Sequence, residues 1–290
     1  SSSSSSKPMA PPPSPAMRPT LSALVAALAA AVRARADSWH PVPGGLLLHD
    51  SCVHSATDWA DVDKALASGC KYPARAQEQV YAMDATAEGN FTQLNSSWTV
   101  PQLPAQAHGQ VVFFWPGLKA QAPEPGRPVL QPVLQYGERG SRRWQLQSWF
   151  VWADNFPPVA ITGHAVDVEP GDAIQSFVEY DGERWTVFGT NVRTGEASRL
   201  QVTGRRAGSM PFKYAMHVLE TVMPSKGYCE LYPADEGVDF KGISVNRGQR
   251  ATWAARVQKT DCGQQVTVTG TGDGIRMTWD SGPSVQSINV

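Results

Sequence analysis

Two polar side chains occupy strand-like runs that are otherwise apolar, and together they could activate water. Gln135 shares one strand face with Val133, because side chains alternate along a strand. Glu220 likewise shares a face with Val218 and Val222. A carboxyl group in such surroundings loses hydration, so we expect its pKa to rise. It could then take a proton from water and return it to a leaving amine, while the amide N–H supports a developing oxyanion.

From residue types alone, structural roles are the commoner interpretation of these two positions. A Gln in a strand usually lies at a surface or a sheet edge, and a Glu near a Pro-ended strand is usually solvated. Both interpretations stay open until the neighbouring elements are considered.

Other catalytic and metal-binding patterns have less support. His164 and His217 could serve as bases, but no Gly-x-Ser-x-Gly elbow accompanies them, and Ser209 lacks that context. A lone His on a strand is more often structural. The sequence has no His-Glu-x-x-His zinc helix. One acidic cluster matches no calcium-loop spacing, so we expect a solvated loop there: Asp235, Glu236 and Asp239.

The elements that must position these residues are short strands. From residue 90 onward, apolar runs bounded by turn residues recur about every 8–12 residues, with no helical pattern between them. This spacing indicates an all-β sandwich or barrel, because a parallel sheet would need crossover helices. The expected strands are 91–100, 110–115, 129–136, 144–152, 164–168, 173–180, 185–191, 198–202, 216–223, 266–269 and 275–279.

The first segments of the chain resemble a targeting leader. Residues 1–16 are a Ser/Pro-rich run that we expect to be disordered. Residues 17–36 combine a basic start, an apolar stretch and an Ala34-Arg35-Ala36 ending, which is the pattern of a signal peptide. We therefore expect a secreted protein. The arginines near the cleavage point keep an organelle transit peptide, and an organelle lumen, open as the alternative.

The segment that follows the leader differs from the strand-rich body. Residues 37–89 are expected to form a small, partly helical N-terminal extension or propeptide, with helices at 58–67 and 74–83. The β-sandwich is then expected over 90–290.

The cysteines and two acceptor triplets fit an exported chain. An even count of four suggests two disulfides, although four free buried thiols would suit an intracellular protein. We expect the local pairs among the three connectivities: Cys52–Cys70 and Cys229–Cys262. The absence of a Cys-x-x-Cys spacing argues against a zinc site. Asn90 and Asn95 begin Asn-x-Ser/Thr triplets and are candidate glycosylation sites.

Net charge and hydropathy argue against nucleic acid and membranes as partners. The 290 residues carry 25 Lys and Arg against 26 Asp and Glu, a net charge of -1. This balance provides no attraction to nucleic acid or to an anionic membrane. No apolar run long enough for a membrane helix follows the leader.

Several segments, in order, resemble the glutamic peptidases, or eqolisins. They span about residues 92–245, and their motifs are Phe113–Leu118, Pro132–Gly137, Trp149–Trp152, Val168–Ile174, Ala215–Glu220 and Cys229–Pro233. The resemblance implies a concanavalin-like antiparallel β-sandwich of two sheets that uses no metal and no cofactor. It also implies that Gln135 and Glu220 are a catalytic pair, and that Trp115, Gln147 and Trp149 line the substrate site.

Three positions depart from the family's pattern. Lys119, Gln147 and Val151 stand where the family has acidic residues. These departures argue against a strongly acidic pH range for activity. They also leave open the alternative that the protein is an inactive homologue.

Two functions therefore compete. The first is a secreted endopeptidase, expected to be a monomer, that acts on polypeptides by direct water attack. The alternative is a non-catalytic, lectin-like or protein-binding module on the same fold. Only the peptidase requires Gln135 and Glu220 to meet in one cleft, near water-bridging distance.

Overall fold

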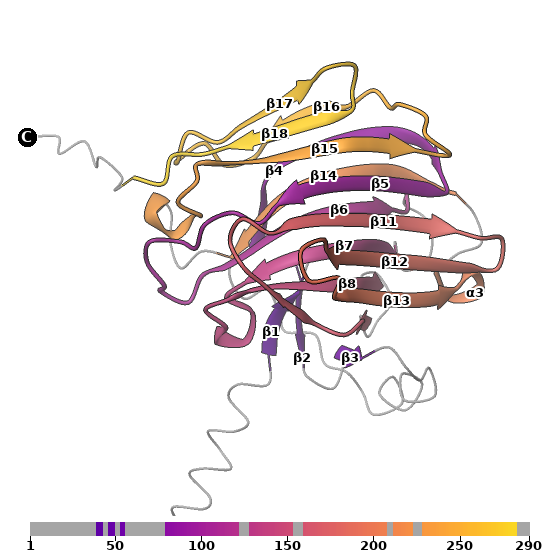
Figure 1. Ribbon diagram of the computed structural model, residues 1–290, viewed down its shortest axis with the longest axis horizontal. Coiled ribbons are helices and arrows are strands. Elements are labelled where there is room, and N and C mark those ends of the chain that lie inside the picture. The colour runs from indigo at the N-terminus through magenta and orange to yellow at the C-terminus, as the bar shows by residue number, and fades with distance from the viewer. Residues whose placement is uncertain are drawn as a thin grey trace, which may run out of the picture. The chain divides into compact units, whose positions relative to one another are not determined.

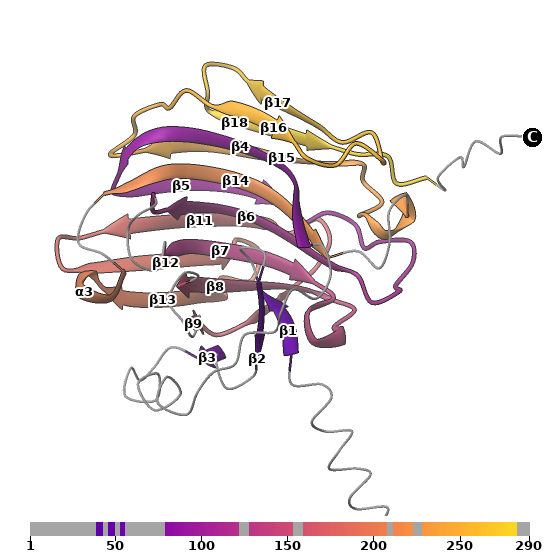
Figure 2. The same ribbon diagram turned by 180° about the vertical axis from the view of Figure 1, so that it is seen from behind.

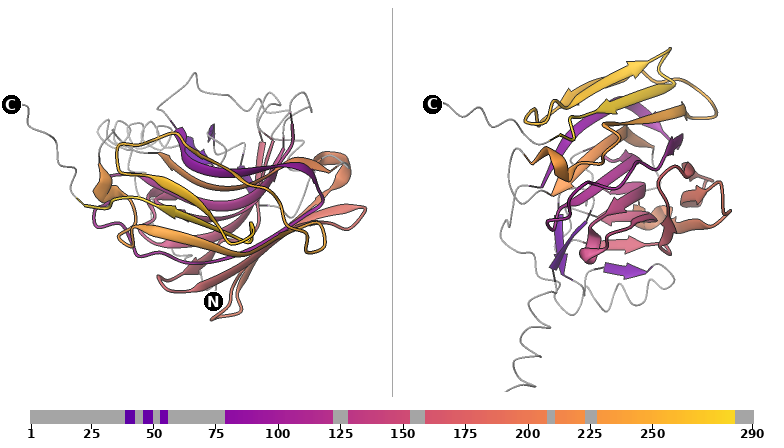
Figure 3. Two further views of the ribbon diagram at one scale, coloured as in Figure 1. Left: turned by 90° about the horizontal axis from the view of Figure 1, so that it is seen from above. Right: turned by 60° about the vertical axis from the view of Figure 1, so that its left-hand side comes forward.

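Two large sheets make up most of the described chain. The computed structural model describes residues 39–42, 46–49, 53–55, 79–121, 128–152, 159–207, 211–222 and 228–282. All of them belong to one unit, Trp39–Val290. Figure 1 shows the two sheets stacked on each other, and Figure 3 lets the layers be followed from above and from the side. The expected two-sheet β-sandwich is confirmed.

The first sheet contains nine strands, in the order β16-β4-β14-β6-β7-β8-β9-β3, with β10 paired to β8. All of its described pairings are antiparallel except β3 with β9. The strands are β3 Val53–Ser55, β4 Gln79–Phe91, β6 Val111–Lys119, β7 Val129–Tyr136, β8 Trp144–Trp152, β9 Val159–Thr162, β10 Val166–Val168, β14 Phe212–Val222 and β16 Ala254–Val257.

The second sheet contains seven strands, in the order β13-β12-β11-β5-β15-β18-β17. They are β5 Gln93–Thr99, β11 Ala173–Tyr180, β12 Arg184–Asn191, β13 Ala197–Thr203, β15 Gly237–Val245, β17 Gln265–Thr269 and β18 Gly274–Thr278. Burial alternates along β5, β11, β12 and β13, because one face meets the core and the other faces water.

The remaining described elements are short. β1 (Trp39–Val42) and β2 (Leu46–His49) form a separate hairpin. The helical turns are η2 Glu138–Gly140, α3 Gly204–Ala207 and η3 Cys229–Leu231. Helix is thus almost absent from the described part of the chain, as the strand spacing predicted.

A continuous aromatic and aliphatic core fills the space between the sheets. Phe114 of β6 lies 5.8 Å from Trp144 of β8 and 5.7 Å from Trp279, measured between ring centroids. Trp185 of β12 and Phe212 of β14 meet edge to face at 4.7 Å. These contacts join the two sheets through side chains of both inner faces.

The central strands of the nine-stranded sheet are buried on both faces. All eight residues of β7 are buried, and so are the first eight of β6. We call the side turned away from the seven-stranded sheet the outer face; Figure 2 views the molecule from this side. A second cluster of buried apolar side chains lies there, distinct from the core between the sheets: Val111, Phe113, Trp115, Val129, Val133, Trp149, Val151, Ala160, Met216 and Val218.

The expected boundary between extension and sandwich is wrong by about ten residues. It was placed at Gly89, but that residue lies inside β4, which begins at Gln79 and pairs along its length with β14. The second expected helix, 74–83, is also wrong over 79–83, because pairing with β14 overrides the helical preference of its Ala and Met residues. The first expected helix, 58–67, lies outside the described residues.

Beyond residue 91, three strands of the described chain were not expected from the sequence, and neither were β1 to β3 before it. β9, β15 and β16 are short or carry charged and Gly residues, which weaken the apolar alternation that marks a strand. Of the expected strand 164–168, only Val166–Val168 is a strand.

Candidate active site

Gln135 and Glu220 lie in one row across three neighbouring strands. Phe113 of β6 pairs with Gln135 of β7 on one side and with Glu220 of β14 on the other. Directly paired residues point to the same face of a sheet, so both side chains project from the outer face. Two strand spacings separate their backbones, about 10 Å. The alternation expected from the sequence therefore holds for both residues.

Trp115 holds the carboxyl group of Glu220. Its indole Nε1 donates a hydrogen bond of 3.1 Å to Glu220 Oε2. Trp115 pairs with Val218 on β14, two residues before Glu220, so the bond crosses the strand pair diagonally. Glu220 and Trp115 are both 0% exposed. Burial makes this hydrogen bond an effective restraint on the carboxyl group.

The side-chain amide of Gln135 uses its nitrogen in a hydrogen bond but not its oxygen. Its Nε2 donates to Gln147 Oε1 at 3.1 Å, and Gln147 Nε2 donates to the Gly163 carbonyl at 2.9 Å. These two consecutive hydrogen bonds fix the orientation of the Gln135 and Gln147 amides. Gln135 Oε1 is buried and accepts no hydrogen bond from any described residue. A buried acceptor of this kind is rare unless a ligand or water uses it.

A further buried amide lies on the same face, and the sequence interpretation missed it. Gln131 pairs directly with Trp149, and both side chains are almost fully buried. Neither amide atom of Gln131 nor the indole nitrogen of Trp149 has a hydrogen-bond partner within the described part of the chain. Alternation with Gln135 along β7 was the available signal, since both positions share one strand face.

The edge of this face next to Glu220 carries a charged group that was also missed. Asp84 of β4 pairs with Val218, and Arg256 of β16 pairs with Asp84. Arg256 Nη2 lies 3.2 Å from Asp84 Oδ2. The polar residues Asp84, Thr86 and Glu88 alternate with apolar ones along β4, which is a strand signal that the sequence interpretation did not use.

The three departures from the acidic pattern also lie on the outer face. Gln147 pairs with Val133, and Val151 with Val129. Lys119 pairs with Val129 as well, at the end of the face remote from the Gln135–Glu220 row. The outer face therefore has no carboxylate at the three positions that are acidic in the family. It has two on β4 instead, Asp84 and Glu88.

A sequence model of the Peptidase A4 family matches residues 81–228, just over half of the chain. The chain belongs to the peptidase A4 family. This peptidase is thus a glutamic-type endopeptidase, and the matched segment includes both Gln135 and Glu220. No curated protein sequence matches the chain.

Two eqolisin structures are similar to this peptidase at low identity. One is SCP-B, a member of the eqolisin family, in a complex with the tripeptide Ala-Ile-His; the similarity covers 69% of this chain and 99% of that one, at 15% identity and a TM-score of 0.46. The other is scytalido-glutamic peptidase with a transition state analog inhibitor, with 70% and 100% covered, 14% identity and a TM-score of 0.47.

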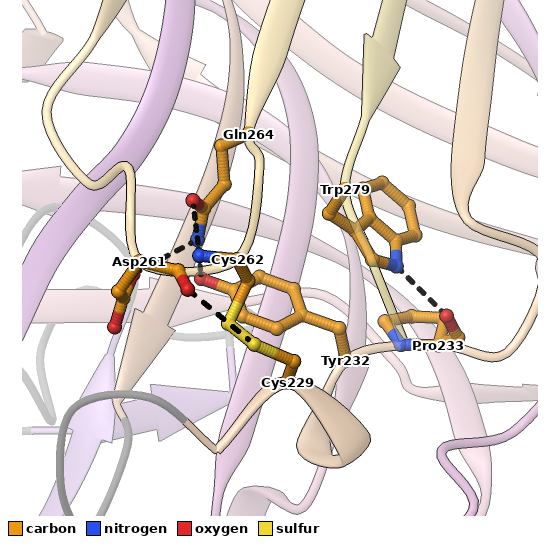
Figure 4. The surroundings of a disulfide bond; sticks show 7 residues. All are labelled: Cys229, Tyr232, Pro233, Asp261, Cys262, Gln264 and Trp279. Atoms are coloured by element: carbon orange, nitrogen blue, oxygen red, sulfur yellow. Dashed lines mark hydrogen bonds between the residues drawn. A yellow bond between two sulfur atoms is a disulfide. The ribbon is translucent and has the colours of Figure 1, made fainter. Parts of the chain in front are cut away.

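A disulfide anchors the segment that follows the Glu220 strand in this peptidase. Cys229 and Cys262 are bonded, with their Cα atoms 5.4 Å apart, which confirms one expected pair. Figure 4 shows Gln264 beside it, donating to the Tyr232 hydroxyl at 2.9 Å. Burial raises the pKa of Tyr232 to about 12, so this group stays neutral. Cys52 and Cys70 lie outside the described residues.

The other residues singled out in the sequence are distant from the outer face or remain predictions. His217 is buried between the sheets and His164 is exposed, so neither joins Glu220. Asn90 is exposed, whereas Asn95 is half-buried and donates to Ser244 Oγ at 3.1 Å. Glycosylation of either stays a prediction.

The described residues contain neither a cluster of metal ligands nor a helix of membrane-spanning length. No group of three or more His, Cys, Asp or Glu side chains there is placed to hold a metal ion. None of the described helices has the length and hydropathy to cross a membrane.

Proposed function

We propose that Gln135 and Glu220 hydrolyse peptide bonds by direct attack of water. The observation that carries the proposal is their common row: two functional groups on one sheet face, separated by a single strand. The unused acceptor of Gln135 and the indole donor on Glu220 support it.

The chemistry follows from the two groups. Glu220 takes a proton from a water held between it and Gln135 Oε1, and the resulting hydroxide attacks the peptide carbonyl. Gln135 has a second N–H beyond the one given to Gln147, and this N–H stabilises the developing oxyanion. Glu220 then returns the proton to the leaving amine. No covalent intermediate forms.

We also propose that the extension is a propeptide. Glu220 is 0% and Gln135 3% exposed, so a polypeptide reaches neither group in this structure. We place the end of the removable segment at residue 78, because β4 is part of the nine-stranded sheet from Gln79 onward.

Export is the second part of the proposal. The leader at 17–36 directs the chain to an oxidising compartment, where the Cys229–Cys262 disulfide is stable. The exposed position of Asn90 suits a glycan added on that route.

One assay tests the peptidase. The purified full chain, before and after acid incubation, is offered an unfolded protein between about pH 2 and pH 7. We expect cleavage that Glu220→Gln abolishes and that Gln135→Ala lowers by about 10²–10³-fold. Glu179→Gln, an exposed carboxyl on the other sheet, is the matched control and should cleave normally. A folded wild-type protein that cleaves nothing across this range would favour the binding-module alternative.

A further inference from the structure

A groove of about 650 Å³ lies on the outer face beside the Glu220 strand. Its walls come from β4, β14 and β16, with the last residue of β6 at one end. Its lining combines apolar contact surface with charges of both signs: Tyr214, Met216, Asp84, Glu88, Lys119 and Arg256.

Asp84 is the member of this groove nearest to Glu220 along the sheet. It pairs with Val218, two residues before Glu220, and diagonal neighbours of this kind have Cα atoms about 7–8 Å apart. Trp115 pairs with the same Val218 from the opposite side. Glu220 therefore lies between an indole donor on one flank and a second carboxylate on the other.

Only one of the two Asp84 oxygens is used within the protein. Oδ2 accepts hydrogen bonds from Thr86 Oγ1 at 2.6 Å and from Arg256 Nε at 3.2 Å. Oδ1 is buried and has no donor among the described residues. The Asp84 side chain is 1% exposed, whereas that of Arg256 is 59% exposed. A buried carboxylate oxygen without a donor is unfavourable, and native proteins seldom keep one without a use.

The groove fits a basic side chain better than any other. A carboxylate oxygen accepts hydrogen bonds only, so its ligand must be a donor, and a cation is the strongest one. Met216 and Tyr214 offer apolar surface for the aliphatic stem of a lysine. Arg256 donates to Oδ2 and leaves Oδ1 available to a second donor.

We propose that Asp84 is a specificity residue that binds a basic side chain of the substrate, next to the bond being cleaved. The inference rests on the proposed function, since it treats the outer face as the place where substrate binds.

The test compares matched peptides on the acid-incubated full chain. A parent peptide carries norleucine at the four positions around the cleaved bond, and each variant replaces one norleucine by lysine. At one position we expect lysine to raise kcat/KM about tenfold or more, the range of a hydrogen bond to a charged group. Asp84→Asn should bring the lysine-to-norleucine ratio close to one.

Two controls distinguish binding of the lysine by Asp84 from an effect of the substitution on folding and from the electrostatic effect of the other charges in the groove. Glu88→Gln removes the same charge from an exposed position further along β4 and should change the ratio less than about threefold. Acetyl-lysine in the wild-type enzyme should behave like norleucine, which tests the charge without any variant. Equal rates for lysine and norleucine at every position, or a preference that survives in Asp84→Asn, would overturn the proposal.

Failure of the proposed function gives a different result. If no peptide is cleaved, binding of the same lysine and norleucine peptides is followed by tryptophan fluorescence. Tighter binding of a lysine peptide that Asp84→Asn abolishes then upholds the subsite while the hydrolase proposal falls. Equal binding of both peptides rejects the subsite as well.

Discussion

His217 should make this protein progressively less stable as the solution becomes acidic. Its imidazole is fully buried between the sheets, with ring centroids 4.9 Å from Phe240 and 5.0 Å from Trp253. Nε2 lies 3.1 Å from Ser96 Oγ, and Nδ1 has no partner in the described part of the chain. Burial disfavours the charged form and lowers the pKa of His217 to about 3.

The size of this loss of stability follows from the difference between the pKa of His217 in the folded state and in the unfolded state. In the unfolded chain the imidazole binds a proton near pH 6.5, whereas in the folded protein it does so only near pH 3. Stability is therefore complete above pH 6.5 and falls as the pH drops towards 3, where the loss levels off. The slope is about 1.4 kcal/mol per pH unit, and the total is about 5 kcal/mol. That is a large part of the typical 5–15 kcal/mol of a folded domain.

Urea unfolding at several pH values measures this contribution. His217→Phe keeps a ring among aromatic neighbours and removes the titrating group. The difference in unfolding free energy between wild type and variant should change by about 1.4 kcal/mol per pH unit between pH 6 and pH 4. The exposed His164→Gln serves as control and should follow the wild type. A difference that stays constant over this range would show that the buried imidazole titrates alike in both states, and the reasoning would be refuted.

Three further predictions concern other side chains. Trp115→Phe removes the indole donor but keeps an aromatic ring, so kcat should fall about tenfold while the fold survives; an unchanged kcat would contradict the restraint described for the carboxyl group. Hydrogen bonding from Arg193 lowers the pKa of Asp172 to about 2, so this carboxylate stabilises the fold above pH 3.8 and loses its effect as the pH falls towards 2. Asp172→Asn should therefore lower the urea midpoint near neutrality but not at pH 2, and an equal shift at both would argue against the ion pair. Replacing Cys229 and Cys262 by Ser should cost about 3–4 kcal/mol in denaturant unfolding, given the 33-residue separation, and an unchanged midpoint would be inconsistent with this link.

Strand positions and side-chain faces were largely predictable, because both follow from local alternation. Gln135, Gln147 and Trp149 point as their position in the strand predicted. The order of strands was not predictable, since β4, β14, β6 and β7 become neighbours through contacts between distant parts of the chain. For the same reason the Asp84 subsite was missed: residues 37–89 were assigned to a partly helical extension, and the neighbours of Asp84 come from far along the sequence.

The placement of Gln135 and Glu220 on central strands, rather than on loops, limits how this enzyme can change. Adding or deleting one residue within β6, β7 or β14 would turn Gln135 or Glu220 towards the opposite side and destroy the pair. Hairpin connections such as Gly137–Arg143 can vary in length without moving either group. Diversification of cleavage preference in this lineage should therefore proceed by substitution at outward-facing positions of the strands, and length variation should be confined to the turns.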